Sequence, residues 1–376
     1  MRRPTAPAAL AVSALLTVAG CSGDSSSGGA PPSSATAVPT ASTAPAAGSA
    51  EVVRTVATRL MSPWGVAALP GGDLLVGSRD TGRIVRVSAA DGRQSVLGTL
   101  PGVAAAGEGG LLGLAVPPGD GAGHVLYAYL TTASDNRIVR VPVDDGRPQG
   151  QRLGTPGTVL SGIPKGTVHN GGRIAFGPDG MLYAGTGESG RRGLAQDRKS
   201  LGGKILRMTP GGRPAPGNPD AGSVVYSYGH RNVQGLAWDA DKRLWASEFG
   251  QDTWDELNLI EPGGNYGWPQ AEGTVGKAGL KDPVQQWRTA DASPSGLAYA
   301  GGCLWLAGLR GERLWRIPLR GAGSAAAPRA HLRGNYGRLR TVVPVEDGGL
   351  WLTTSNTDGR GSPAADDDRL LRLKVT

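Results

Sequence analysis

The stretch that decides the fold is Gly172-Arg-Ile-Ala-Phe-Gly-Pro-Asp-Gly-Met-Leu-Tyr-Ala-Gly185, which leads on to Gly203-Lys-Ile-Leu-Arg-Met208. Short apolar runs are separated here by Gly, Pro and Asp, a pattern typical of short antiparallel strands. Pro178-Asp179-Gly180 supplies residues that tolerate the positive φ angles of a tight turn. The stretch therefore predicts a strand, a tight turn, a second strand, a loop and a third strand.

The same unit occurs six times along the chain, and the other five copies lie at 63–87, 109–141, 232–260, 294–317 and 339–373. One such sheet cannot bury both of its faces alone, whereas six sheets packed radially can, and a closed ring leaves only short edges. The sequence therefore predicts an all-β fold, a six-bladed β-propeller of four-stranded antiparallel blades. The stretch Glu51–Ala57 is expected to add the outer strand that closes the ring. A pair of β-sandwiches is the alternative architecture.

The N-terminal residues lie outside this repeat. An apolar stretch, Ala8–Gly20, follows two arginines and is too short for a membrane-spanning helix, so it is typical of a signal peptide. It ends in Val18-Ala19-Gly20-Cys21, which resembles a bacterial lipobox with Cys21 as the lipidated residue; an ordinary signal peptide is the alternative. We expect an extracytoplasmic, lipid-anchored protein whose segments are a lipoprotein signal peptide (1–21), a disordered Ser/Ala/Pro/Gly linker (22–50) and the propeller (51–376).

Cysteine count and charge narrow the class of protein. There are two cysteines, and with Cys21 in the lipobox Cys303 has no partner, so no disulfide framework is expected. Cys303 lies in an apolar run and is predicted to be a small buried hydrophobe. The net charge of +8 suits anionic partners, but the arginines are scattered over strand ends and loops without a basic block. We therefore expect no nucleic-acid partner.

Propellers bind ligands at the mouth of the central channel, so polar residues just before inner strands are the candidates for function. His169 lies in Thr167-Val-His-Asn-Gly-Gly172, where open backbone and a near-neutral side chain suit proton abstraction. Arg231 and Asn232 hold the same place in the fourth unit and offer a guanidinium and an amide to an oxygen-rich anion. A structural loop histidine and a solvated turn are the alternatives.

Acidic and basic residues form two further groups. Carboxylates cluster in 247–256, before the glycine-rich 263–268, and suit a hard cation such as Ca²⁺, although the spacing is not that of an EF-hand. Arg310, Arg338 and Arg340 occupy matching places in the last two units, and the latter two share a strand face. Such cations would repel one another unless a polyanion lies between them. A solvated acidic loop and exposed arginines are the alternatives.

Together these residues resemble the soluble glucose/aldose sugar dehydrogenases that use pyrroloquinoline quinone (PQQ). The similarity runs in one order over roughly residues 55 to 375. The motifs that carry it are Glu108-Gly-Gly-Leu-Leu-Gly113, His169-Asn-Gly-Gly-Arg173, Tyr228-Gly-His-Arg-Asn232, Asp255-Glu-Leu-Asn-Leu-Ile260, Gly263-Gly-Asn-Tyr-Gly-Trp-Pro269, Leu309-Arg-Gly-Glu-Arg-Leu-Trp-Arg-Ile317 and Arg338-Leu-Arg340.

The resemblance implies PQQ- and calcium-dependent oxidation of aldoses, and it gives each candidate a role. His169 corresponds to the general base that takes the sugar hydroxyl proton while hydride passes to the quinone. The remaining residues correspond to cofactor-binding positions (Glu108, Arg231, Asn232, Arg310, Arg338, Arg340) and to metal positions (Gly250 and Gln251 for the catalytic Ca²⁺, Glu256 and the Tyr266 carbonyl for a second Ca²⁺). The implied partners are a small sugar, an external electron acceptor and, through the lipid anchor, a membrane.

The sequence departs from the family pattern at four places. Val168 stands where the family has an aspartate before the base, and Glu108 stands where it has a glutamine near the quinone. Gln251 replaces a proline at the metal, and Arg310 replaces a lysine. Two alternatives therefore remain at this point. One is a non-enzymatic surface propeller lipoprotein that binds a glycan or a protein, and the other is a calcium-dependent lactonase-type hydrolase.

Overall fold

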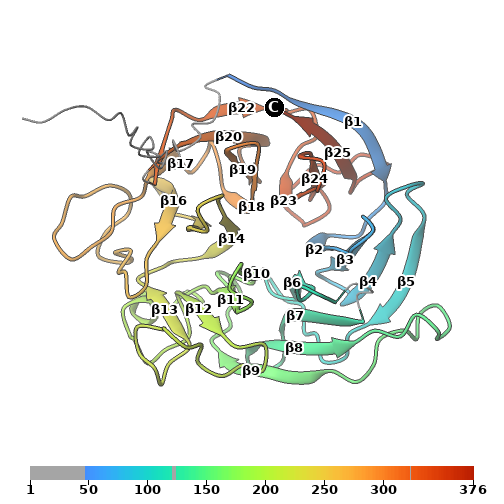
Figure 1. Cartoon of the computed structure of the whole chain (residues 1–376), viewed down its shortest axis with the longest axis horizontal. Coiled ribbons are helices and arrows are strands. Elements are labelled where there is room, and N and C mark those ends of the chain that lie inside the picture. Colours follow the sequence, from blue (N-terminus) through green and yellow to red (C-terminus); the bar gives the residue numbers. More distant parts are fainter. Residues whose placement is uncertain (1–46, 121–123, 322) are drawn as a thin grey trace, which may run out of the picture. The chain divides into compact units, whose positions relative to one another are not determined.

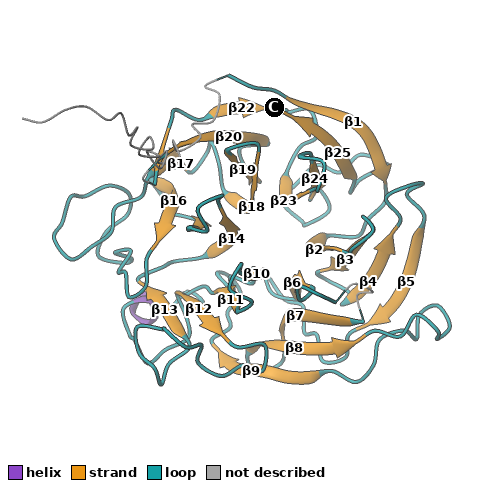
Figure 2. Ribbon diagram, viewed as in Figure 1, coloured by secondary structure: helices purple, strands orange, loops and turns teal. Residues whose placement is uncertain are grey.

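A computed structural model describes residues 47–120, 124–321 and 323–376. Cys21, the signal peptide and most of the predicted linker lie outside these residues. The strands form six antiparallel sheets arranged as a ring (Figure 1). Strands and loops make up nearly all of it, and a short 3₁₀ helix, η1 (Arg192–Ala195), follows the third sheet's second strand (Figure 2). No helix among the described residues is long and apolar enough to cross a membrane.

Each blade of the first half of the ring runs in chain order from the centre outwards. Its strands are β2 (Pro63–Ala68), β3 (Leu74–Ser78), β4 (Arg83–Val87) and β5 (Gln94–Thr99) in blade 1; β6 (Leu111–Ala115), β7 (Val125–Thr131), β8 (Asn136–Pro142) and β9 (Gly157–Ile163) in blade 2; and β10 (Ile174–Phe176), β11 (Leu182–Gly185), β12 (Lys204–Met208) and β13 (Val225–Tyr228) in blade 3.

The second half follows the same plan, except that blade 5 carries an extra short strand and blade 6 takes its outer strand from the N-terminal side. The strands are β14 (Val233–Trp238), β15 (Leu244–Glu248), β16 (Trp254–Ile260) and β17 (Gln285–Arg288) in blade 4; β18 (Pro294–Ala300), β19 (Cys303–Gly308), β20 (Arg313–Arg320), β21 (Ser324–Ala325) and β22 (Arg329–His331) in blade 5; and β23 (Leu339–Pro344), β24 (Leu350–Thr354), β25 (Leu370–Val375) and β1 (Ala50–Ala57) in blade 6.

The ring closes as the sequence predicts. β1 pairs antiparallel with β25, from Ala50 opposite Val375 to Ala57 opposite Leu370. The strand begins at Ala50, one residue before the expected boundary. The six-bladed propeller is confirmed, and the sandwich alternative is wrong because each sheet packs against two neighbours rather than one.

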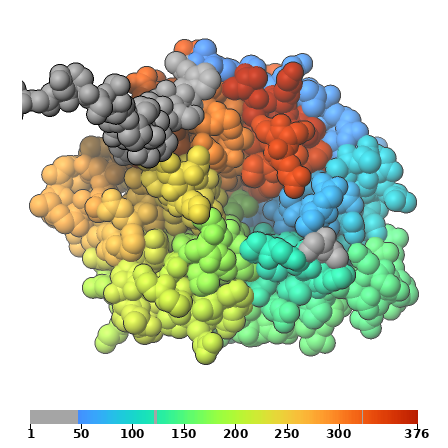
Figure 3. Space-filling model, viewed as in Figure 1, coloured from blue at the N-terminus to red at the C-terminus, as the bar shows by residue number. Residues whose placement is uncertain are grey.

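The core lies between adjacent blades. The second strands of blades 4, 5 and 6 are buried along their whole length, because the neighbouring sheets cover both of their faces. Trp245 and Trp305 are among the fully buried side chains, and Cys303 is a free, buried thiol as expected. Figure 3 shows the sheets packed side by side around a hollow at the centre of the ring.

Inner strands approach closely around this centre, which is possible because glycine occurs in them at matching places. A Cβ atom at Gly113 of β6 would lie 2.2 Å from the carbonyl oxygen of Gly172 in blade 3. A Cβ atom at Gly235 of β14 would lie 2.5 Å from the carbonyl oxygen of Ser295 in blade 5. The loops that leave the inner strands are therefore held within reach of one another.

Candidate active site

A cavity of about 460 Å³ lies where loops of all six blades meet. Nine of the eleven cofactor, catalytic and metal residues predicted from the sequence line it: Glu108, His169, Arg231, Asn232, Gly250, Gln251, Arg310, Arg338 and Arg340. These residues span more than two hundred positions of the chain, from Glu108 to Arg340, and the ring closure brings them together.

The loop before β10 presents His169 to this cavity. His169 has a φ of 54°, an unusual value for a non-glycine residue, and its peptide N–H donates to Oε2 of Glu108 over 2.9 Å. Its Nδ1 lies 2.5 Å from Oε1 of Glu188. A carboxylate at Nδ1 favours the tautomer with the proton on that nitrogen, which leaves Nε2 free to accept a proton.

Glu188 is a site residue that sequence reasoning missed. It follows β11 in the same blade as His169, and its side chain is buried, with 1 % exposed. It gives the His169 imidazole a carboxylate partner, although Val168 is the residue directly before the base. The available signal was Thr186-Gly-Glu-Ser-Gly190, a carboxylate between glycines at the end of a strand that neighbours the catalytic loop.

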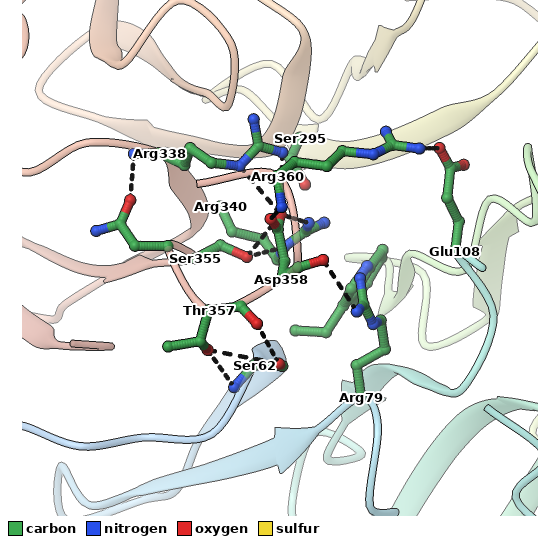
Figure 4. Close-up of polar contacts among 12 residues, drawn as sticks. Ser62, Arg79, Glu108, Ser295, Arg338, Arg340, Ser355, Thr357, Asp358 and Arg360 are labelled. Carbon is green, nitrogen blue, oxygen red and sulfur yellow. Dashed lines mark hydrogen bonds and ion pairs between the residues drawn. The ribbon is translucent and has the colours of Figure 1, made fainter. Parts of the chain in front are cut away.

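Arg338 and Arg340 lie at the inner edge of blade 6, both buried, and both bind one carboxylate. Oδ2 of Asp358 accepts from Nη2 of Arg338 over 2.9 Å and from Nη2 of Arg340 over 3.0 Å (Figure 4). Burial alone would raise the pKa of Asp358, but the attraction of Arg340 and Arg338 outweighs it and lowers the pKa. The chain thus places one negative charge of its own between these cations.

Two further arginines join this network. Arg79 donates to the carbonyl oxygen of Asp358 over 3.3 Å, and Arg360 pairs with Oε1 of Glu108 over 2.8 Å (Figure 4). Glu108 therefore connects the peptide of His169 to a loop of blade 6. Asp358 and Arg360 could not be predicted as site residues, because their role depends on which blades become neighbours.

The cavity has an excess of positive charge. Six arginines and three carboxylates line it, which gives a formal charge of +3 with His169 neutral. Arg310 is exposed and makes no hydrogen bond or ion pair within the described part of the chain. Such a lining suits a ligand with several carboxylates.

Arg231 and Asn232 have polar atoms available for a ligand. Nη1 of Arg231 donates to the carbonyl of Phe249 over 3.3 Å, whereas its buried Nε has no partner among the described residues. Burial lowers the pKa of Arg231. Oδ1 of Asn232 accepts from the N–H of Gly171 over 2.9 Å, so its amide group is fixed in orientation.

Gly250 and Gln251 lie in the loop between β15 and β16. The N–H of Gly250 donates to Oδ1 of Asp255 over 2.9 Å, and the loop carbonyls of Gly250 and Gln251 accept no hydrogen bond within the described residues. Burial raises the pKa of Asp255 to about 6. Unpaired carbonyl oxygens next to a carboxylate are the donors that a hard cation prefers.

Glu256 and Tyr266 do not line this cavity. They line a neighbouring space of about 10 Å³ together with Glu248 and Glu272, and Arg231 and Gly250 border both spaces. Burial, with Glu248 nearby, raises the pKa of Glu256. Its two oxygens accept from the N–H of Gly273 over 2.7 Å and from Nδ2 of Asn258 over 3.0 Å.

The acidic stretch is therefore not a cluster of side-chain ligands. No group of three or more His, Cys, Asp or Glu side chains among the described residues is arranged to hold a metal. The calcium site expected in this stretch stays a prediction. Strand alternation separates neighbours such as Asp255 and Glu256, and backbone N–H groups donate to one oxygen of each.

The fold and the site define a class: a six-bladed propeller in which a carboxylate-oriented histidine lies beside an arginine-lined cavity for an anionic ligand. A family model described as glucose/sorbosone dehydrogenase matches residues 60–372. The chain therefore belongs to the glucose/sorbosone dehydrogenase family, which decides against the lactonase-type alternative.

Several relatives agree with this membership. The chain is 31 % identical over 280 residues to the aldose sugar dehydrogenase YliI of Escherichia coli, covering 68 % of this chain and 74 % of the relative. The solved structure of the PQQ-bound aldose sugar dehydrogenase from Streptomyces coelicolor is 67 % identical, with a TM-score of 0.87, and covers 89 % of this chain and 100 % of that one. The solved structure of a putative oxidoreductase (glucose dehydrogenase) from Thermus thermophilus is 45 % identical, with a TM-score of 0.79, and the match covers 87 % of this chain and 100 % of that one.

Proposed function

We propose that this protein is an aldose sugar dehydrogenase that uses PQQ as its hydride acceptor. The observation that carries the proposal is the His169–Glu188 pair at 2.5 Å beside a cavity with a formal charge of +3. The charge matches the three carboxylates of PQQ, and a sequence 67 % identical has been solved with PQQ bound.

The cavity residues fit this cofactor. Arg310, Arg338 and Arg340 would bind its carboxylates, and Arg231, with its unpaired buried Nε, would donate to the quinone oxygens together with Asn232. When bound, PQQ supplies an electrophilic carbon that accepts hydride from the sugar.

His169 supplies the complementary proton chemistry. Its Nε2 would accept the proton of the sugar hydroxyl while hydride leaves the carbon that bears this hydroxyl. Glu188 holds the ring in orientation and stabilises the imidazolium that forms, since its carboxylate is buried against Nδ1. The proton can then pass to solvent, because 18 % of the His169 side chain is exposed.

Calcium is proposed as the second cofactor. The unpaired carbonyls of Gly250 and Gln251 line the same cavity as the arginines and would hold Ca²⁺ beside the quinone, where a cation polarises the carbon that receives hydride. Glu256 and the Tyr266 carbonyl are proposed as part of a second, structural Ca²⁺ site. An external electron acceptor would then reoxidise the cofactor.

The extracytoplasmic, lipid-anchored location is likewise proposed from the sequence Val18-Ala-Gly-Cys21 alone. The first strand of the propeller begins at Ala50, the last residue of the expected linker, so a tether of about thirty residues would separate it from the membrane.

The test separates chemistry from cofactor binding. Purified protein is titrated with PQQ at saturating Ca²⁺ by absorbance, and aldose turnover is followed with an artificial electron acceptor. His169→Ala should lower kcat by about 10²- to 10⁴-fold with little change in PQQ affinity. Arg338→Ala should raise the PQQ dissociation constant by about tenfold or more, since a charge-assisted contact contributes about 1.5–3 kcal/mol.

Two outcomes would overturn the proposal. Wild-type turnover in His169→Ala would remove the base assignment. A wild-type protein that binds no PQQ in the presence of Ca²⁺ would favour the alternative hypothesis of a non-enzymatic surface propeller.

A further inference from the structure

The turn between β15 and β16 has an unusual arrangement of its peptide groups. Five consecutive N–H groups, those of Gly250 to Trp254, all donate to carboxylates of this chain. Asp255 accepts the first, and a single oxygen, Oε1 of Glu272, accepts the other four. The four distances to Glu272 are 2.7, 3.1, 3.0 and 3.0 Å, in chain order.

Glu272 reaches this turn from elsewhere in the blade. It lies in the long connection between β16 and β17 and does not line the central cavity, whereas Gly250 and Gln251 do. The turn is closed tightly around it, since a Cβ atom at Gly250 would lie 1.8 Å from the carbonyl oxygen of Trp254 and 2.7 Å from Oε1 of Glu272. Consecutive N–H groups that converge in this way form an anion-binding concavity, and here the anion is the chain's own carboxylate.

Because a peptide group is planar, the hydrogen bonds to Glu272 also fix the direction of the carbonyl groups of Gly250 and Gln251. The N–H of Gln251 belongs to the same peptide group as the carbonyl of Gly250, and the N–H of Asp252 to that of Gln251. Within a trans peptide the two bonds point in opposite directions, so N–H groups fixed on Glu272 turn these two carbonyls away from it. The carboxylate also polarises the peptide groups, which makes the carbonyl oxygens better cation ligands.

We propose that Glu272 is a positioning residue that aims the carbonyl oxygens of Gly250 and Gln251 into the cavity for a divalent cation. The inference rests on the proposed function, in which these carbonyls hold Ca²⁺. Glu272 does not line the cavity, so it is neither a ligand of the cation held there nor a contact of the sugar. Its effect passes only through the peptide groups of the turn.

The test measures cation binding rather than turnover. Glu272→Ala, Glu272→Gln and wild type are loaded with PQQ and titrated with Ca²⁺, followed by the absorbance of the cofactor and by the shift in melting temperature. Outer partners of metal ligands typically contribute about 10- to 100-fold in affinity, so Glu272→Ala should raise the Ca²⁺ dissociation constant by at least tenfold. Glu272→Gln keeps an oxygen acceptor without its charge, so its Ca²⁺ dissociation constant should lie between those of wild type and Glu272→Ala.

Asp282→Asn is the matched control. Asp282 lies in the same connection and also accepts N–H groups of a turn, those of Val275 and Gly276, but within the described residues it accepts no hydrogen bond from residues 250–254. The Asp282→Asn variant should bind Ca²⁺ with the same affinity as wild type. If Glu272→Ala does not fold, as judged by circular dichroism, Glu272→Gln carries the comparison and must still weaken Ca²⁺ binding.

The outcomes distinguish this inference from the proposed function. A Glu272 variant that melts earlier but binds Ca²⁺ within twofold of wild type would show a merely structural role and overturn the inference. A wild-type protein that binds neither PQQ nor Ca²⁺ would overturn the proposed function instead.

Discussion

Glu188 decides which nitrogen of His169 meets the substrate. Its carboxylate is buried and bound to Nδ1, so the ring is held with Nε2 toward the cavity. Glu108 fixes the peptide of the same residue in its unusual backbone conformation. The catalytic geometry thus depends on two carboxylates, each contributed by a different loop.

The first prediction concerns this pair. Glu188→Gln should lower kcat by about 10- to 100-fold, as expected when a histidine loses the outer partner that fixes its tautomer. PQQ affinity should change little, because Glu188 does not line the cavity. Steady-state kinetics with saturating PQQ and Ca²⁺ check this, with the exposed Glu346→Gln as the control. Unchanged kcat in Glu188→Gln would contradict the assigned role.

The second prediction concerns Asp358 and pH. The folded pKa of Asp358 lies below its ordinary value of 3.8, because attraction to Arg340 and Arg338 outweighs burial. Its stabilising contribution is therefore present above the unfolded pKa and is lost as pH falls through the lower, folded pKa. Asp358→Asn should lower the unfolding free energy at pH 7, by up to about 3–5 kcal/mol, since it leaves two buried cations without an anion.

Thermal melts from about pH 7 to pH 3 measure how the stability contributed by Asp358 changes with pH. The gap in melting temperature between wild type and Asp358→Asn should narrow at the acid end, and PQQ should restore part of the loss at pH 7, because its carboxylates replace the missing anion. Asp241→Asn, whose carboxylate pairs on the surface with Arg243, should show no comparable gap. A gap that widens on acidification would refute the assignment.

At the scale of secondary-structure elements, close contact between inner strands positions the site. β6 lies against the loop of blade 3 that carries His169, and Gly113 makes this approach possible. β1 closes the ring by pairing with β25, so the outer edge of blade 6 is not left free. Both contacts join parts of the chain that are distant in sequence.

The third prediction tests the inner-strand contact. Gly113→Ala would put a Cβ atom 2.2 Å from the carbonyl oxygen of Gly172, so the backbones of blades 2 and 3 must separate. Overpacking of this kind typically costs about 1–3 kcal/mol, which denaturant unfolding can measure. kcat should also fall, since the loop with His169 moves. Gly193→Ala, where a Cβ atom meets nothing within 4 Å, is the control and should leave both unchanged.

At the scale of the whole molecule, loops of different blades meet at one cavity. Arginines of blades 4, 5 and 6 converge on one cavity, and their mutual repulsion is only partly balanced by Asp358. A ligand that binds only the folded ring raises its stability.

The fourth prediction follows from this linkage. Removal of Ca²⁺ with EGTA should abolish PQQ-dependent turnover and lower the melting temperature of the loaded protein. A ligand at one hundred times its dissociation constant contributes about 2.7 kcal/mol of stability. Adding back Ca²⁺ should restore both properties and Mg²⁺ should not, because Mg²⁺ requires a smaller, octahedral site. Full activity after exhaustive chelation and dialysis would argue against a calcium quinoprotein.

The fifth prediction concerns the anchor. Cys21→Ser should move the protein, expressed in a bacterial host that processes lipoproteins, from the detergent phase to the aqueous phase in phase partitioning, because the acyl chains that bind it to the membrane would be absent. The propeller should keep its melting temperature. Unchanged partitioning would contradict the lipobox interpretation.

The repeat, the six blades and the closing strand could all be predicted from the amino-acid sequence. Apolar alternation and turn residues act locally, so each blade's strands can be located from neighbouring residues. The sequence also predicted nine of the residues that line the cavity, among them His169, Arg231 and Arg338, which occupy equivalent places just before inner strands. The resemblance to sugar dehydrogenases added their roles.

The residues that hold these site side chains in place could be identified only once the chain was seen folded. Glu188 reaches His169, Asp358 joins Arg338 to Arg340, Arg360 reaches Glu108, and Glu272 binds four amides of another loop. Each contact is made by a carboxylate or guanidinium in a loop whose own sequence resembles a solvated turn. Their partners depend on how the blades close into a ring, and no local pattern in the sequence encodes that distance.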